Sequence, residues 1–281
     1  MKIRFIVNPV SGTGNYKNLE KVLESELDTV LFQYDICFTK GPKHATELAQ
    51  EAKEERIDIV AAVGGDGTMN ECAQALLNSN TALSVIPCGS GNGFAFHFGM
   101  HKKLVKAVQQ LNLCGFKTID TCTANGHFFC NVSGIGFDAH IAHLFSKDNK
   151  RGFFNYMRLI FREFRYPAKS YTLLYNGFEK EVNAFVISWA NASQFGNNAV
   201  ISPESKVDDE LVDICVLTKF PIRAIPKLLS RLFNQSMHQS KYMEIIRCKE
   251  MVIIGGDELC HLDGEPINLG KKIHLKLIPQ S

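Results

Sequence analysis

The sequence has no paired cysteines and almost no excess charge. Its nine cysteines are scattered singly, without a C-x-x-C pair, and their number is odd. This pattern disfavours a disulfide framework or a zinc site and is typical of reduced, partly buried thiols. A formal net charge of +2 is far below the basic excess that nucleic-acid phosphates require. We therefore expect no nucleic acid partner.

The sequence also lacks repeats and long apolar runs, and we expect no targeting segment. Its amino terminus enters a strand pattern without a signal core, and no apolar run approaches bilayer length. With 45% hydrophobic residues, the 281 residues are enough for two ordinary domains. We expect a cytoplasmic protein that meets membranes only at their surface.

The organisation of the chain changes near residue 122. In residues 1–122, apolar strand patterns alternate with helical patterns. This alternation predicts a Rossmann-like, doubly wound α/β domain. The predicted strands include residues 2–8, 32–38 and 83–86 and an apolar stretch at 57–62, and the predicted helices are residues 18–27, 45–56, 69–77 and 104–111.

Residues 123–281 have a different pattern. Asn-Gly pairs at 125–126 and 176–177 each separate two strand-like runs, which is a strong hairpin signal. The second domain is therefore predicted to be mainly antiparallel β. Further strands are predicted at residues 184–189, 211–217, 251–254 and 273–278.

Residues 63–71 (VGGDGTMNE) join an apolar strand to a helix. Glycine allows a phosphate to approach the backbone, and the helix start offers free N–H donors. Asp66 would repel that phosphate unless a cation lay between them, so the motif indicates a nucleotide bound with Mg²⁺. A glycine-rich turn with Asp66 as a helix cap is the alternative.

Two more loops of small residues follow predicted strands, at 8–14 (NPVSGTG) and 87–93 (PCGSGNG), and Thr39 ends a fourth strand. Such loops gather at the carboxyl edge of an open α/β sheet. Glu71 could reach a ribose hydroxyl, orient the loop or lie on the helix surface, and His44 suits a capping or packing role. The predicted nucleotide-binding residues are Asn8, Ser11, Gly12, Thr39, Gly64, Gly65, Asp66, Gly67, Thr68, Glu71, Gly89, Ser90 and Asn92.

The ordered set of motifs resembles the diacylglycerol kinase catalytic-domain family, which includes sphingosine, ceramide and bacterial lipid kinases. The matching motifs are NPxSG at 8–12, Thr39 followed by His44 and Ala45, GGDGTxNE at 64–71, GSGN at 89–92, GIGFDA at 134–139 and DGE at 263–265. The resemblance implies a C-terminal β-sandwich beside the nucleotide domain. It also implies ATP and Mg²⁺ as cofactors and a membrane lipid as acceptor.

Phosphoryl transfer to a hydroxyl needs a carboxylate to accept the proton and cations to neutralise the phosphates. Glu265 follows Asp263 and Gly264 in a predicted turn that could project across an interdomain cleft. By resemblance, Glu265 is the better candidate for the general base, and Asp66 for organising Mg²⁺ and the terminal phosphate. The reverse assignment stays open, and a solvated hairpin turn is the plain alternative.

Residues 134–139 also satisfy G-x-G-x-x-A. We reject a dinucleotide site there, because the segment follows a hairpin in a β-rich region and does not open a βαβ unit. In the resembling kinases this segment approaches the acceptor. Asp138 is therefore predicted to contact the lipid headgroup, with a structural role in the turn as the alternative.

Residues 207–213 (VDDELVD) form an acidic cluster. Such a cluster is usually a solvated turn. The resembling bacterial kinases have a DDGxxD turn there that holds a structural Mg²⁺. By that resemblance Asp209 is a candidate metal ligand. Glu210 replaces the family glycine, so the site would be distorted if this position has a positive φ.

Residues 147–169 interleave basic and aromatic side chains, which suits an anionic membrane surface. Residues 221–233 form a second amphipathic candidate. We favour an ordinary helix covering a sheet for this segment, and the same interpretation is the alternative for residues 147–169. Lys150 or Arg151 could instead contact the nucleotide phosphates.

Two motifs bear on the identity of the acceptor. Gly93 after Asn92 resembles the pattern of the sphingoid-base kinases, whereas residues 134–139 resemble the diacylglycerol kinases. We favour diacylglycerol or a related glycerolipid. A soluble NAD kinase and a noncatalytic nucleotide-responsive lipid-binding module are further alternatives, and the oligomeric state stays open.

Overall fold

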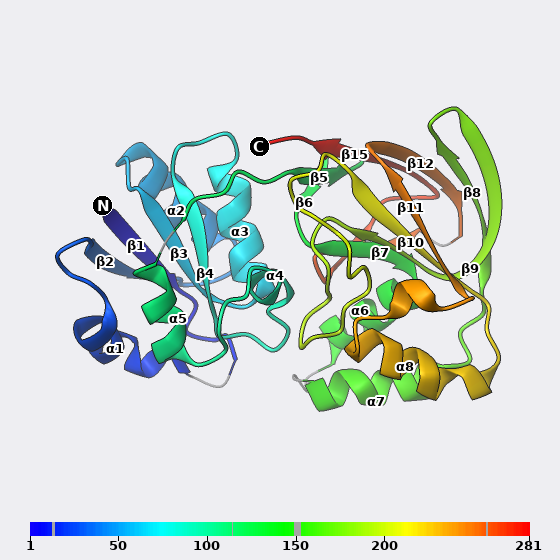
Figure 1. The fold of residues 1–281 in the computed structure, drawn as a ribbon, viewed down its shortest axis with the longest axis horizontal. Helices are drawn as coiled ribbons and strands as arrows, with labels where there is room; N and C mark the ends of the chain where they lie inside the picture. Colours follow the sequence, from blue (N-terminus) through cyan, green and yellow to red (C-terminus); the bar gives the residue numbers. More distant parts are fainter. Residues whose placement is uncertain (13–14, 114, 149–152, 257) are drawn as a thin grey trace. The chain divides into compact units, whose positions relative to one another are not determined.

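The computed structural model describes residues 1–12, 15–113, 115–148, 153–256 and 258–281. The chain divides into two compact units, Met1–Lys117 and Thr118–Ser281 (Figure 1). The first is a parallel α/β unit and the second is a mainly antiparallel β unit with a sandwich-like core. The fold class predicted from the sequence is therefore confirmed.

The first unit contains a four-stranded parallel sheet in the order β2-β1-β3-β4. β1 and β3 are central and almost wholly buried, which explains their continuous apolar sequences. The strands are β1 (Lys2–Val7), β2 (Gln33–Phe38), β3 (Ile59–Gly64) and β4 (Ala82–Pro87).

Helices cover both faces of this sheet. Leu23 and Val108 pack with Phe5 on one face, and Ala49 and Cys72 pack with Ile6 and its neighbours on the other. The alternation of face along β1 follows from the two-residue period of a strand. The helices are α1 (Leu19–Glu26), α2 (His44–Glu54), α3 (Asp66–Leu76), α4 (Gly93–His97) and α5 (Leu104–Leu111), with a 3₁₀ turn at Asn15–Asn18.

The second unit contains an 11-stranded sheet in the order β14-β13-β7-β9-β8-β12-β15-β5-β6, and β10 joins β9 to β11. Its core includes Trp189, Phe129 and Leu173. The strands are β5 (Thr121–Ala124), β6 (His127–Phe129), β7 (Val132–Gly136), β8 (Lys169–Tyr175), β9 (Phe178–Ala190), β10 (Val212–Thr218), β11 (Met243–Cys248), β12 (Glu250–Gly255), β13 (Leu259–Leu262), β14 (Glu265–Asn268) and β15 (Lys272–Ile278).

Both predicted Asn-Gly hairpins are present. Asn125 and Gly126 have φ values of 49° and 82° between β5 and β6. Asn176 and Gly177 have φ values of 49° and 78° between β8 and β9. Two successive positive φ angles identify the turn type that matches the twist of a two-residue hairpin.

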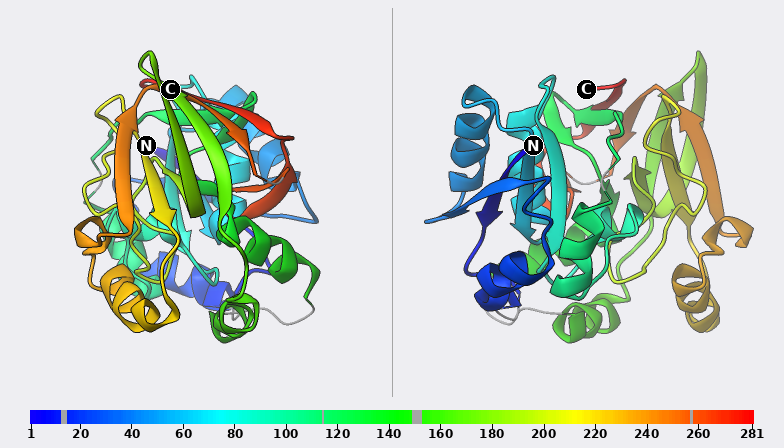
Figure 2. Two further views of the ribbon diagram at one scale, coloured as in Figure 1. Left: turned by 90° about the vertical axis from the view of Figure 1, so that its right-hand side faces the viewer. Right: turned by 60° about the vertical axis from the view of Figure 1, so that its left-hand side comes forward.

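Three helices lie at one end of the second unit, below the strands in Figures 1 and 2. They are α6 (Phe137–Lys147), α7 (Phe153–Glu163) and α8 (Ile225–Phe233), with 3₁₀ turns at Ile222–Ala224 and Met237–Gln239. Ile141, Leu159 and Leu228 pack together in their shared core. α6 was not among the predicted elements. Its preceding strand, β7, pairs with antiparallel neighbours, so residues 134–139 do not open a βαβ unit.

Candidate active site

The predicted phosphate-binding loops lie at the carboxyl edge of the parallel sheet. Asn8 follows β1, and its side-chain amide donates to Thr68 Oγ1 over 3.0 Å. Asn8 Oδ1 accepts from the Val10 N–H at 3.1 Å, and Ser11 Oγ donates to the Asn8 carbonyl at 3.0 Å. The loop after β1 is thus linked to the first turn of α3.

Backbone contacts hold the same loops together where only glycine fits. A Cβ on Gly12, which has φ +61°, would lie 1.6 Å from the Cys88 carbonyl oxygen. A Cβ on Gly89 would lie 2.4 Å from the Cα of Gly65. The loops after β1, β3 and β4 therefore approach each other backbone to backbone, without side chains between them.

Asp66 orders the loop after β4. Its Oδ2 accepts from the Asn92 N–H at 2.7 Å, and its Oδ1 accepts from the Phe94 N–H at 3.4 Å. Asn92 has φ 56° and exchanges two hydrogen bonds with the Gly89 backbone, each 2.8 Å long. Asp66 therefore caps α4 from another element, in addition to any role with a cation.

Glu71 caps a second helix. Its Oε1 accepts from the Lys43 N–H at 3.0 Å, and its Oε2 accepts from the Ala45 N–H at 3.2 Å, at the start of α2. His44 Nδ1 accepts from the Lys40 N–H at 3.0 Å. Glu71 thus orients the loop after β2, and its contact with a ribose stays a prediction.

The remaining predicted residues of the first unit occupy the same edge. Thr39 is buried directly after β2, and its N–H donates to the Val7 carbonyl at 2.9 Å. Gly64 ends β3, and Gly67 and Thr68 lie in the first turn of α3. Ser90 is exposed in the loop after β4. The structure thus gathers the predicted nucleotide residues on one sheet edge, whereas Asp138, Asp209 and Glu265 belong to the second unit.

Asp263 and Gly264 form the turn between β13 and β14, and Glu265 is the first residue of β14. Asp263 and Gly264 have φ values of 48° and 91°. The buried Asp263 carboxylate accepts from the N–H groups of Cys130 and Asn131 at 3.0 and 2.9 Å. Glu265 is exposed, and no residue in the described parts of the chain donates a hydrogen bond to its carboxylate. The Asp263 carboxylate is therefore anchored inside the protein, whereas the Glu265 carboxylate is exposed to solvent.

Asp138 is buried in the first turn of α6. Its Oδ1 accepts from the Ala139 N–H at 2.8 Å, and its Oδ2 accepts from Ser188 Oγ at 3.1 Å. His261 Nε2 lies 3.2 Å from the same Oδ2. A Cβ on Gly134 would lie 2.7 Å from that oxygen, so glycine leaves space for the carboxylate. These contacts are all internal, and a contact with the lipid headgroup stays a prediction.

Sequence reasoning did not include His261. It lies in β13 only two residues before Asp263, in an otherwise apolar strand. A titratable side chain in such a strand, next to a candidate catalytic turn, is the signal that could have identified it.

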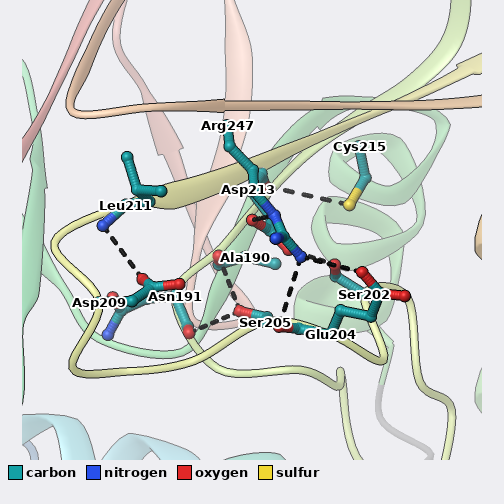
Figure 3. Close-up of polar contacts among 10 residues, drawn as sticks. All are labelled: Ala190, Asn191, Ser202, Glu204, Ser205, Asp209, Leu211, Asp213, Cys215 and Arg247. Carbon is teal, nitrogen blue, oxygen red and sulfur yellow. Dashed lines mark hydrogen bonds and ion pairs between the residues drawn. The ribbon is translucent and has the colours of Figure 1, made fainter.

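The acidic turn at 207–213 lies before β10. Asp209 Oδ1 accepts from the Leu211 N–H at 3.1 Å (Figure 3). Glu210 has φ 58°, so this position does adopt the left-handed conformation that favours glycine, and Glu210 forms an ion pair with Lys249. Within the part of the chain that the structure describes, no group of three or more His, Cys, Asp and Glu side chains could hold a metal. Asp209 as a metal ligand stays a prediction.

A separate buried carboxylate lies beyond this turn. Asp213 accepts from Ser202 Oγ at 2.5 Å and from Arg247 Nε at 3.1 Å (Figure 3). Burial raises the pKa of Asp213, although Ser202 and Arg247 oppose that shift. Asp213 is thus a structural carboxylate with fixed partners.

Two family models match consecutive parts of the chain. The diacylglycerol kinase catalytic domain matches residues 2–124, and the YegS C-terminal NAD kinase beta sandwich-like domain matches residues 131–280. The chain belongs to the YegS-like lipid kinase family. It is therefore a kinase, and the family implies ATP as the phosphoryl donor.

Individual relatives agree with this family. A Chromohalobacter salexigens protein named "Probable lipid kinase YegS-like" is 28% identical over 229 residues, which cover 78% of this chain and 73% of that protein. A Yersinia pestis protein with the same name is 26% identical over 84% of this chain and 81% of its own length. A solved Bacillus anthracis structure described as a candidate diacylglycerol kinase superposes with a TM-score of 0.80 at 26% identity, covering 99% of this chain and 94% of that chain.

Proposed function

We propose that this kinase transfers the γ-phosphoryl group of Mg²⁺-bound ATP to a hydroxyl of diacylglycerol or a related glycerolipid. The observation that carries the proposal is that two carboxylates have different surroundings. Asp66 lies among tightly packed glycine loops that suit a polyphosphate, and Glu265 stands exposed on a well-anchored turn.

The glycine loops are the proposed ATP site. Their glycine backbones lie close together at the carboxyl edge of a parallel sheet, beside the start of α3. Phosphates bind well in such a position because N–H donors and the helix dipole both favour negative charge. Asn8 and Ser11 fix the first of these loops, and Asn92 fixes the third.

The donor chemistry of this edge fits Mg²⁺. A nucleotide-bound Mg²⁺ commonly uses one or two protein carboxylates, and phosphates and water complete its octahedral shell. Asp66 supplies a carboxylate directly beside Gly65 and Gly67. When bound there, the cation would neutralise the charge that develops on the transferred phosphoryl group.

Glu265 is the proposed general base. Its carboxylate is exposed and accepts no hydrogen bond from the described residues, so it is available to take the proton of an acceptor hydroxyl. The neighbouring Asp263 is unsuited to that role, because its oxygens accept from Cys130, Asn131 and Ser133.

Contact with an anionic membrane surface is part of the proposal. No helix in the described ranges is long and apolar enough to cross a membrane. The helical end of the second unit exposes Phe161 by 62% and Ile222 by 71%, and Arg223, next to Ile222 in sequence, and Lys227 in α8 are also exposed. Exposed apolar and basic side chains together favour binding to anionic lipid headgroups.

The basic charge of residues 147–169 is partly neutralised within the protein. Arg158 pairs with Asp148 at 3.1 Å, and Arg162 pairs with Glu163 at 2.8 Å. Lys150 and Arg151, the alternative phosphate ligands, lie outside the described residues. The proposed membrane contact is therefore supported more by Ile222 and the exposed Arg223 and Lys227 than by residues 147–169.

A flotation assay tests the membrane contact. Ile222→Ser should reduce flotation with anionic vesicles, whereas Phe178→Ser is the matched control, because Phe178 is 67% exposed on β9 and lies outside the helical end. Equal flotation of the two variants with anionic vesicles would contradict this part of the proposal. So would wild-type binding to zwitterionic vesicles that is as strong as its binding to anionic vesicles.

Transfer of γ-labelled phosphate from Mg-ATP tests the reaction. Diacylglycerol, a sphingoid base and NAD would be offered in parallel, with the lipids in mixed micelles. Labelled phosphatidate made by the wild type and lost in Glu265→Gln supports the proposal. Label in the sphingoid base or in NAD would move the assignment to that acceptor, and label in none would leave a binding module.

A further inference from the structure

We propose that His261 positions the catalytic turn, and that Asp138 acts through it. His261 holds the backbone of Gly264, the residue directly before Glu265, and Asp138 fixes the orientation of the His261 ring. The inference rests on the proposed function of Glu265 as general base. It assigns to Asp138 a role in positioning the base.

The hydrogen bonds of His261 define its tautomer. The side chain is buried, with 3% of the residue exposed, and its Nδ1 accepts from the Gly264 N–H at 3.2 Å. A backbone N–H can only donate, so Nδ1 carries no proton in this arrangement. The ring proton of the neutral imidazole is therefore on Nε2, which donates to Asp138 Oδ2 at 3.2 Å.

Asp138 is itself firmly held. Its Oδ1 accepts from the Ala139 N–H and its Oδ2 also accepts from Ser188 Oγ, so both oxygens have protein donors. Gly134 leaves space for the carboxylate and pairs with His261 across β7 and β13. Ser188 of β9 thus contacts Asp138 of α6, Asp138 contacts the buried His261 ring, and the ring contacts the exposed turn at Gly264. Such a rigid supporting contact is what a precisely placed catalytic group requires.

The turn is held at two successive residues. Asp263 is fixed through Cys130, Asn131 and Ser133, and Gly264 is fixed through His261. The Glu265 carboxylate has no partner of its own among the described residues, so its direction depends on the backbone before it. A lost contact at Gly264 would leave Asp263 anchored and Glu265 paired with Leu262, and would loosen the turn between them, which sets the direction of the Glu265 side chain.

Two substitutions at His261 separate its two hydrogen bonds. The side-chain oxygen of asparagine can occupy the place of Nδ1 and accept from Gly264, but the side chain is too short to reach Asp138. The side-chain nitrogen of glutamine can occupy the place of Nε2 and donate to Asp138, but glutamine then offers no acceptor to Gly264. His261→Asn and His261→Gln are therefore a matched pair of uncharged amides.

We expect His261→Gln to lower kcat for lipid phosphorylation by about tenfold or more, because displacement of a catalytic group is costly. Its KM for Mg-ATP should stay near the wild-type value, since the proposed nucleotide loops belong to the first unit. His261→Asn should restore most of kcat, to within about threefold of wild type, because it keeps the contact with the turn. Equal kcat values for the two variants, or losses that merely follow their melting temperatures, would overturn the proposal.

A second readout does not depend on turnover. Hydrogen–deuterium exchange at the Gly264 amide should be slow in wild type and in His261→Asn, and faster in His261→Gln. Equal exchange in all three proteins would overturn the assigned contact. If the wild type phosphorylates no lipid, the proposed function fails, while the exchange measurement still decides whether His261 holds the turn.

Discussion

The two carboxylates assigned to the chemistry differ in how they are held. Asp66 accepts from the backbone of Asn92 and Phe94, so it supports the loop that it borders. The Glu265 carboxylate accepts from no described residue, and Glu265 is supported through its backbone, by the preceding turn and by its pairing with Leu262. A carboxylate that also supports structure cannot be removed without disturbing its surroundings, whereas an exposed one can be neutralised cleanly.

The largest expected effect is on turnover by Glu265→Gln. Loss of a general base lowers rates by about 10²- to 10⁴-fold. Because the side chain is exposed and without a described partner, we expect ATP affinity and melting temperature to stay at wild-type values. Turnover assays with calorimetric ATP titration would check this. An active Glu265→Gln enzyme would show that Glu265 is not the general base.

Asp66→Asn should give a different profile. The amide can still accept one backbone hydrogen bond, but it presents N–H to the other donor and loses the charge that suits Mg²⁺. We expect kcat/KM for Mg-ATP to fall about tenfold or more and stability to fall by roughly 1–2 kcal/mol. Steady-state kinetics at several Mg²⁺ concentrations and urea unfolding would measure both. Identical profiles for Asp66→Asn and Glu265→Gln would remove the distinction between the two carboxylates.

The elements that sequence reasoning predicted well depend on local patterns. The continuous apolar runs of β1 and β3 indicate a buried parallel sheet. The Asn-Gly pairs at 125–126 and 176–177 specify their hairpins because Asn and Gly tolerate the positive φ angles that the turn requires. Such features need only a few neighbouring residues.

The parts that were not predicted depend on distant partners. Asp66 and Glu71 each cap a helix at its first residues, which lie more than 25 positions away in sequence, α4 and α2 respectively. The contact between His261 and Asp138 joins residues 123 positions apart. Neither residue type nor spacing indicates such a pairing, because it forms only when β7, β13 and α6 are assembled.

Gly12→Ala should weaken the first unit and its nucleotide loops. The added Cβ would meet the Cys88 carbonyl oxygen at 1.6 Å, and φ +61° is strained for alanine. We expect a loss of at least about 1–3 kcal/mol in unfolding free energy, with weaker ATP binding. Gly41→Ala is the matched control, since nothing lies within 4 Å of its added Cβ. Similar ATP affinities for the two variants would show that the close approach of the loops is not required.

The smallest effect is expected at Asp213, because this buried carboxylate has no proposed part in the reaction. Burial raises its pKa above the value in the unfolded chain. The folded protein therefore holds this proton more tightly, so the stability that Asp213 contributes is present at acid pH and is lost as the pH rises through its folded pKa. Asp213→Asn should make the unfolding free energy depend less steeply on pH in that range, while kcat changes little compared with Glu265→Gln. Urea unfolding at a series of pH values would check the slope. A large loss of kcat with unchanged stability would instead connect this structural carboxylate to the reaction and extend the comparison to a third residue.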